Sequence, residues 1–331
     1  MDAETIVGTP MKRAALACVV LLCAARAWPA DRYAVVITGA AGGEAYARKY
    51  DAWRATFVDT LKTRFGYPND RLFVLAEKES QGVRTATREN VREVLTDLRK
   101  RVTKDDQLLV LLIGHGTPVD TPGDDAKFNL VGPDLTATEW EQLVKPIPGR
   151  LVFVDTTSAS VPFLRKLAGR GRVVLTATDS VAQQYETVFP DFFVKAFDDA
   201  SADADKNGRV SIWEAFTYAS AGVQQWFEQK AQLPTERPLL DDTGEGVGRE
   251  AQNPGTDGAI ARITYIQPDA PLTLPADTGL ATLVRRQADL ESQIEELKAR
   301  KDTTPADQYE GELERLLIEL ARVAVQIRSK S

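Results

Sequence analysis

Cysteine and histidine are scarce in this chain of 331 residues. Its two cysteines, Cys18 and Cys23, both lie near the amino terminus, and His115 is the single histidine. The rest of the chain therefore offers no disulfide, no thiolate ligand for a metal and no cysteine nucleophile. Any nucleophile or metal site beyond residue 30 must do without a thiolate.

Basic runs and long apolar runs are also missing. Lys and Arg total 41 against 48 Asp and Glu, which gives a formal net charge of −7 at pH 7. No cluster of basic residues is interleaved with aromatic ones, so the sequence argues against a nucleic-acid partner. The apolar run at residues 14–25 is shorter than the ~20 residues that a bilayer-spanning helix needs, so we expect no stable membrane anchor.

The amino end has the pattern of a secretory signal. Lys12 and Arg13 precede the apolar run, and the small-x-small sequence at residues 25–27 follows it. We therefore predict a cleaved signal at residues 1–30, with Met11 as a possible true start, and export to a periplasm or the extracellular space. A buried amino-terminal helix, or a lipoprotein anchored through one of the cysteines, is the alternative.

Residues 31 to about 230 alternate short β-branched runs with amphipathic helical patterns. One of these runs is apolar on both faces, as expected of a central parallel strand. The alternation predicts an α/β fold with a parallel sheet. The expected strands lie at residues 33–38, 71–75, 108–113, 151–154 and 172–178.

Polar side chains follow three of these strands. His115 lies between two glycines after the third strand, small hydroxyl residues occupy positions 156–160 after the fourth, and residues 176–180 follow the fifth. Since ligands gather beyond the carboxyl ends of parallel strands, these residues are a candidate site. The structural alternative is that Ser158 or Ser160 caps the helix that begins near Pro162.

The order of strand-GHG, strand-hydroxyl cluster and strand-TAT resembles the caspase and legumain superfamily of cysteine peptidases over residues 31–230. In that family a His-Gly follows the third strand and the catalytic cysteine follows the fourth. The resemblance implies a caspase-like, parallel-rich sheet sandwiched by helices, with His115 at the histidine position. Matching Ser160-Val161 to the family's Ser-Gly puts Ser158 at the cysteine, whereas matching Asp155 to its acidic residue puts Thr157 there.

In either register a hydroxyl replaces the thiol. A hydroxyl nucleophile needs a base in hydrogen-bond contact, and that base must be oriented by a third group. No motif ties a nearby carboxylate to His115, the candidates being Asp120, Asp124 and Asp155. We therefore predict an inactive peptidase-like domain that serves recognition or scaffolding for a protein or peptide partner. An active hydrolase that uses Ser158 or Thr157 with His115 is the alternative.

The stretch DADKNGRVSIWE at residues 203–214 fits the EF-hand calcium loop at each position. Gly208 occupies the position of the sharp turn, and helical patterns flank the loop. The loop predicts a Ca²⁺ site, structural or regulatory; a solvated acidic turn is the alternative. The expected oxygen ligands come from Asp203, Asp205, Asn207, the carbonyl of Arg209, Ser211 and Glu214.

The carboxyl-terminal part divides into two segments. Residues 249–278 are rich in Pro and Gly and read as a linker with one possible strand at 261–266. Residues 279–331 carry apolar residues at heptad spacing in two runs, which predicts a helical hairpin or coiled coil. Its apolar stripe must be buried on its partner helix, on the main domain at residues 31–248, or on another chain, which could be a second copy or another protein.

Overall fold

The computed structural model describes residues 30–119, 124–269, 274–275, 277–299, 301 and 304–330. The predicted signal, except for Ala30, lies outside the described residues, and so does Asp120. Within the described ranges, no helix combines the length and the apolar character needed to cross a membrane.

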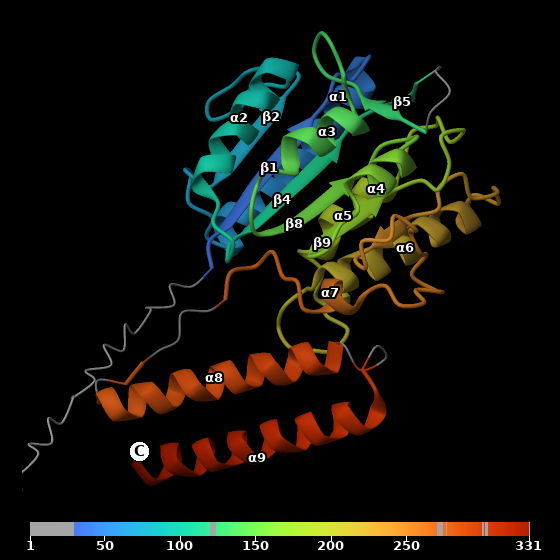
Figure 1. Cartoon of the computed structure of the whole chain (residues 1–331). Coiled ribbons are helices and arrows are strands. Elements are labelled where there is room, and N and C mark those ends of the chain that lie inside the picture. Colours follow the sequence, from blue (N-terminus) through green and yellow to red (C-terminus); the bar gives the residue numbers. More distant parts are fainter. Residues whose placement is uncertain are drawn as a thin grey trace, which may run out of the picture.

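A seven-stranded sheet, in the order β10-β9-β8-β4-β1-β2-β3, forms the centre of the molecule (Figure 1). Its strands run parallel, apart from β10, which pairs antiparallel with β9 at one edge. The predicted α/β class with a parallel-rich sheet is therefore confirmed. The strands are β1 (Arg32–Thr38), β2 (Leu72–Ala76), β3 (Arg84–Thr85), β4 (Gln107–Ile113), β8 (Arg150–Asp155), β9 (Arg172–Thr176) and β10 (Leu239–Asp241).

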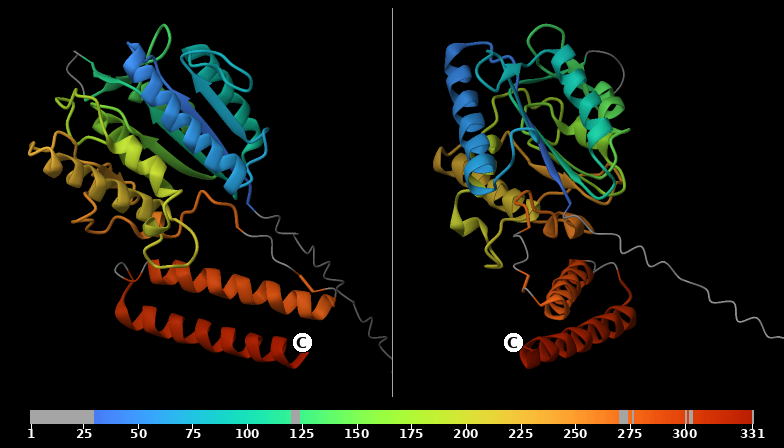
Figure 2. Two further views of the ribbon diagram at one scale, coloured as in Figure 1. Left: turned by 180° about the vertical axis from the view of Figure 1, so that it is seen from behind. Right: turned by 90° about the vertical axis from the view of Figure 1, so that its left-hand side faces the viewer.

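Helices cover both faces of the sheet, because its central strands are apolar on both sides. One face is covered by α1 (Glu44–Asp59), α5 (Phe189–Ala196) and α6 (Ile212–Gln229). The other is covered by α2 (Arg88–Arg101), α3 (Ala137–Val144) and α4 (Val161–Leu167). A π-helical turn (Thr60–Arg64) extends α1. Figure 2 shows this three-layer arrangement from two further sides.

A small antiparallel sheet follows directly after His115. It consists of β5 (Gly116–Pro118), β6 (Ala126–Phe128) and β7 (Leu135–Thr136). The sequence predicted a loop here, because strands this short show no alternation of apolar and polar residues. Since β5 begins at Gly116, its position is fixed by the end of β4.

Much of the predicted linker packs against the main domain. The backbones of Leu240 and Arg249 exchange two hydrogen bonds of 2.9 and 2.8 Å, and Ile266 is fully buried. The strand expected at 261–266 is wrong, because the segment contains the end of α7 (Ala259–Arg262) and a turn. The carboxylate of Asp242 accepts hydrogen bonds from three backbone N–H groups at the start of α7. These bonds stabilise a helix where the sequence predicted a strand.

The predicted helical hairpin is confirmed as α8 (Thr278–Ala299) and α9 (Ala306–Lys330). The two helices are antiparallel, and α8 lies between α9 and the main domain (Figures 1 and 2). Apolar side chains at the predicted heptad positions form the hairpin's own small core. The buried members are Leu290, Ile294, Leu297, Leu316 and Val323.

Candidate functional site

The carboxyl ends of β4 and β8 bring the GHG motif and the hydroxyl residues together, as the predicted topology required. We call His115, residues 155–160 and Thr178 the strand-end cluster. The hydroxyl of Ser158 donates a hydrogen bond of 3.0 Å to the carbonyl oxygen of Gly116. The fit is close, because a Cβ added at Gly116 would lie 1.9 Å from the carbonyl oxygen of Ser158.

Both predicted nucleophiles are buried, and their hydroxyl protons are already donated. Ser158 is 3% exposed and donates to Gly116, whereas Thr157 is fully buried and donates to the carbonyl oxygen of Ser158 at 3.1 Å. Among the described residues, no hydrogen bond joins His115 to either hydroxyl. The imidazole is thus not in the contact that would activate a hydroxyl nucleophile.

His115 is half-buried and is held by the segment around α1. Its Nε2 lies 3.1 Å from the carbonyl oxygen of Ala41, which can only accept, so Nε2 carries the proton and donates. The hydroxyl of Tyr50 lies 3.2 Å from Nε2 and 3.4 Å from Nδ1, and burial raises the pKa of Tyr50, which keeps this phenol protonated. Tyr46 packs edge-on against the imidazole, with ring centroids 4.8 Å apart.

Neither described aspartate named as a possible orienting group contacts His115. Asp124 forms an ion pair with Arg165. Asp155 is fully buried, accepts a hydrogen bond of 3.0 Å from the backbone N–H of Thr157, and leaves its second oxygen without a partner. Burial raises the pKa of this carboxyl to about 7. Within the described chain, a Ser-His-Asp type of relay is not assembled.

The hydroxyl groups do not cap α4, so that structural alternative is wrong. Ser160 is the residue at the cap position, but its hydroxyl pairs with the hydroxyl of Thr178 at 3.0 Å. The hydroxyl of Thr156 donates to the carbonyl oxygen of Leu112 at 2.7 Å. These side chains instead link the ends of neighbouring strands β4, β8 and β9, which is a role that sequence spacing did not reveal.

The second candidate site is the segment 203–214, which we call the acidic loop. Oxygen atoms of Asp203, Asp205 and Glu214 all lie within 4.8 Å of one another. Gly208 has φ +83°, in the left-handed region that the sharp turn of the loop requires. The structure thus brings together three of the six residues predicted as calcium ligands.

The loop is ordered by hydrogen bonds to its carboxylates. Asp203 accepts from the backbone N–H groups of Asn207 and Gly208 at 3.0 and 2.8 Å. Glu214 accepts from Ala204 at 2.9 Å and also forms a capping box with Ser211 at the start of α6. Ser211 and Glu214 therefore fix the beginning of the outgoing helix as well as the loop.

Negative charges crowd one another in the loop. The pKa of Asp205 is raised, first by burial and then by the nearby charges of Glu214 and Asp203. Asn207 orients its side chain toward Tyr265, whose hydroxyl lies 3.1 Å from Nδ2, and its Oδ1 accepts from the backbone of Arg209 at 2.9 Å. Like charges held this close favour a cation between them.

The flanks of the loop match the helix–loop–helix expectation on one side. The outgoing helix α6 begins at Ile212, inside the loop, as an EF-hand requires. The incoming helix α5 ends at Ala196, and a 3-10 turn (Ala200–Ala202) separates it from Asp203. The backbone N–H of Ile212 donates to Thr264 at 2.8 Å, so the segment after α7 braces the loop from outside.

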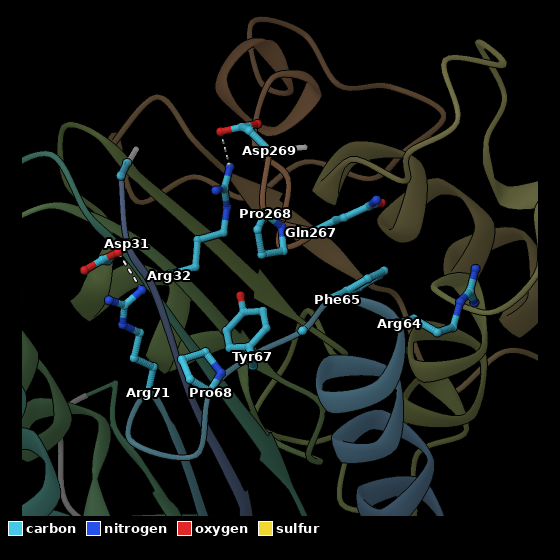
Figure 3. A pocket seen from close by; sticks show the side chains of 12 residues that line it. Asp31, Arg32, Arg64, Phe65, Tyr67, Pro68, Arg71, Gln267, Pro268 and Asp269 are labelled. Atoms are coloured by element: carbon cyan, nitrogen blue, oxygen red, sulfur yellow. Dashed lines mark hydrogen bonds and ion pairs between the residues drawn. The ribbon is translucent and has the colours of Figure 1, made fainter. Parts of the chain in front are cut away.

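Two cavities lie away from the strand-end cluster. One of about 530 Å³ is lined by Asp205 and Glu214 of the acidic loop, by Tyr218 of α6 and by Lys298 of α8. The other, of about 420 Å³, lies at the amino end of β1 (Figure 3). Its three arginines are ion-paired, so their charges do not favour an anionic ligand. The pairs are Arg32 with Asp269, Arg71 with Asp31 and Arg64 with Asp198.

Comparisons with known proteins add little. No family model matches the chain, and no curated protein matches it. Among solved structures, it is similar to protein GSU0716 from Geobacter sulfurreducens, with a TM-score of 0.42, 13% identity and coverage of 64% of this chain and 92% of the other. It is also similar to drICE, with a TM-score of 0.38, 9% identity and coverage of 64% and 87%. drICE is a caspase, and the similarity to it is weak.

Proposed function

We propose that this is an exported calcium-binding protein, in which a caspase-like domain without peptidase chemistry serves recognition or scaffolding. The observation that carries the calcium assignment is the convergence of the three carboxylates in the acidic loop. Their oxygens lie within 4.8 Å of one another, which is twice a Ca–O distance of about 2.4 Å. A point shared by three oxygens this close lies at most about 2.8 Å from each, so a small inward movement of the side chains would let one ion contact Asp203, Asp205 and Glu214 together.

The donor set also suits calcium. Carboxylate, amide and carbonyl oxygens are the hard ligands that Ca²⁺ takes, and Asn207 and the carbonyl of Arg209 would add to the carboxylates. The ion would supply charge that offsets the repulsion between the acidic side chains. With three carboxylates the affinity falls in the range of extracellular calcium modules, roughly 10⁻⁴–10⁻³ M.

The hydrogen bonds of the hydroxyl groups support the proposal that the domain lacks peptidase chemistry. Ser158 donates to Gly116 and Thr157 donates to Ser158, while Nε2 of His115 donates to Ala41. Activating either hydroxyl would require breaking these bonds and moving the imidazole. No observation favours the alternative hydrolase over this arrangement.

Calorimetric titration of calcium tests the metal assignment. We expect the unmodified protein to bind one Ca²⁺ and Glu214→Gln to bind it at least about 100-fold more weakly, because the amide cannot bind through two carboxylate oxygens. Glutamine still completes a capping box, so the start of α6 is kept. Glu228→Gln, the same change on the exposed face of α6, is the matched control and should bind normally. No binding at about 10 mM Ca²⁺ would contradict the assignment.

The same titration separates a structural site from a sensor. A structural site raises the melting temperature without a change in shape, whereas a sensor changes its near-ultraviolet circular dichroism or its scattering profile.

Export belongs to the proposal because the charged, apolar and small-residue pattern of residues 1–30 is that of a secretory signal. Sequencing the amino terminus of protein recovered from the periplasm or medium tests it, and we expect a start just after Ala27 or Ala30.

A further inference from the structure

Helix α9 has a second apolar face that its partner α8 does not cover. Leu316 and Val323 face α8 and are 1% and 7% exposed, whereas Leu317, Ile318 and Val325 are 46%, 45% and 57% exposed. Half of the exposed large apolar side chains of the described residues lie on this helix. Single exposed apolar residues are ordinary, but a cluster on one helix face marks an interaction surface.

This second face points away from the rest of the molecule. α9 lies on the far side of α8 from the main domain in all three views (Figures 1 and 2). No described segment packs on it. A hairpin of two helices also buries little apolar surface by itself, so a further layer on α9 would stabilise it.

The stripe is symmetric about Ala321. Leu317 lies four residues before it and Val325 four residues after it, while Glu314 and Arg328 lie seven residues before and after. At 3.6 residues per turn, all four positions fall within about 40° of Ala321 around the helix axis. The apolar positions therefore mirror one another, and the charged positions mirror one another with opposite sign.

A two-fold axis through Ala321 would match this pattern with itself. In an antiparallel pair of α9 helices, Leu317 would contact Val325 of the partner subunit, and Glu314 would face Arg328 of the partner subunit. The small side chain of Ala321 lets the two backbones approach at the axis. A surface that complements itself in this way is what an isologous dimer requires.

The charges favour the antiparallel arrangement over a parallel one. Among the described residues, neither Glu314 nor Arg328 has an ion-pair partner, whereas Arg315 and Glu319 on the polar side of α9 pair with one another. In a parallel pair, Glu314 would face Glu314 of the partner subunit, and Arg328 would face Arg328 of the partner subunit. The antiparallel pair instead forms two Glu–Arg pairs.

We propose that two copies of this chain associate through α9, antiparallel about a two-fold axis at Ala321, so that the helices of the two hairpins stack in the order α8-α9-α9-α8. The interface consists of Glu314, Leu317, Ile318, Ala321, Val325 and Arg328 from each copy. This inference is independent of calcium binding and of any catalytic role.

Sedimentation equilibrium of the full chain gives the first test. We expect a dimer for the unmodified protein and a monomer for Ala321→Glu, which places two carboxylates against one another at the axis. Gln326→Glu adds the same charge on the polar side of α9 and should remain a dimer. Far-ultraviolet circular dichroism checks that the helices are retained. A monomeric unmodified chain, including one that binds another protein through α9, overturns the proposal, as does a dimer that survives Ala321→Glu.

Charge reversal gives a test that keeps the apolar face intact. Glu314→Arg alone and Arg328→Glu alone should each raise the dimer dissociation constant roughly tenfold, because each removes two ion pairs and creates two like-charge contacts. The double variant should return the constant to near its original value. Single and double variants that all bind as the unmodified chain does would overturn the antiparallel pairing.

Cross-linking tests the direction of the pair. In a chain with Cys18→Ser and Cys23→Ser, the only thiol is the one introduced. Ala321→Cys should form a disulfide-linked dimer on mild oxidation. Leu317→Cys should not, because its two copies would lie eight residues apart, about 12 Å along the axis, beyond the reach of a disulfide. Equal cross-linking of both variants would show a parallel pair and overturn the proposal.

Discussion

The strand-end cluster and the acidic loop both place polar side chains at the ends of regular elements, but the hydrogen-bond partners of those side chains differ. In the cluster, buried hydroxyls donate to carbonyl oxygens or to one another, as Ser158 does to Gly116. In the loop, carboxylates accept from backbone amides and still face one another within 4.8 Å. Polar residues at a strand end are thus no sign of reactivity by themselves, whereas converging carboxylates are the feature on which the proposed calcium site rests.

The largest expected effect concerns how tightly the cluster is closed. Gly116→Ala would place a Cβ 1.9 Å from the carbonyl oxygen of Ser158 and 2.6 Å from the hydroxyl of Thr157. Since this oxygen belongs to the backbone, the strand ends must separate, and we expect a loss of about 3 kcal/mol in the free energy of unfolding. Urea denaturation measures it. A loss below about 1 kcal/mol would show that the backbones at Gly116 and Ser158 are less tightly packed than the structure indicates.

The pH dependence of stability tests the buried carboxyl of the cluster. Burial raises the pKa of Asp155 from 3.8 to about 7, so its contribution to stability is fully present below pH 3.8 and is lost as the pH rises through 7. We expect the unmodified protein to lose about 2–3 kcal/mol more than Asp155→Asn between pH 5 and pH 8. Glu236, whose pKa burial also raises to about 7, is present in both proteins and cancels in the difference.

Urea midpoints of both proteins at the two pH values measure this difference. Parallel pH profiles for the unmodified protein and Asp155→Asn would mean that the carboxyl reaches water in the folded state.

The acidic loop should tolerate a methyl group better than the cluster does. A Cβ at Gly208 meets no atom within 4 Å, so Gly208→Ala suffers only from its φ of +83°. We expect it to cost about 1–2 kcal/mol in stability, with and without Ca²⁺, because the left-handed conformation is already present in the loop. Thermal denaturation under both conditions measures this cost. A cost as large as that of Gly116→Ala would remove the contrast between an open loop and a closed cluster.

The smallest effect concerns the predicted nucleophile. Ser158→Ala removes the hydrogen bond to the carbonyl oxygen of Gly116 and a longer one, 3.4 Å, from the N–H of Gly116, and it should cost about 1 kcal/mol. A serine-directed phosphonate should label neither the unmodified protein nor this variant, because the hydroxyl proton of Ser158 is donated to Gly116. Labelling at Ser158 that disappears in His115→Ala, detected by mass spectrometry, would support the hydrolase instead.

The sequence predicted the parts of the fold that carry periodic apolar patterns. Strands of five or more residues, from β1 to β9, follow from short β-branched and apolar runs, and both helices of the hairpin follow from heptad spacing. The short strands β3, β5, β6, β7 and β10 were missed because two or three residues establish no period. Pairing with a neighbour, and not local preference, makes them strands.

The candidate sites divide in the same way. The acidic loop is contained within twelve residues, so spacing alone predicted that Asp203, Asp205 and Glu214 would converge. In the strand-end cluster, the hydroxyl of Ser158 bonds to a residue 42 positions away, and that of Ser160 to one 18 positions away. Such partners depend on how strands are ordered in the sheet. Strand order can bring the residues near one another but does not say which atom donates to which.

The position of β1 has a consequence for how the chain is made. This strand, the first of the described chain, lies inside the sheet between β2 and β4. Because the chain is synthesised from its amino end, β1 leaves the ribosome well before its pairing partner β4 (Gln107–Ile113) is made. Parallel strands that are distant in sequence pair slowly. Until β4 is synthesised, the edge of β1 therefore stays unpaired and is prone to aggregation.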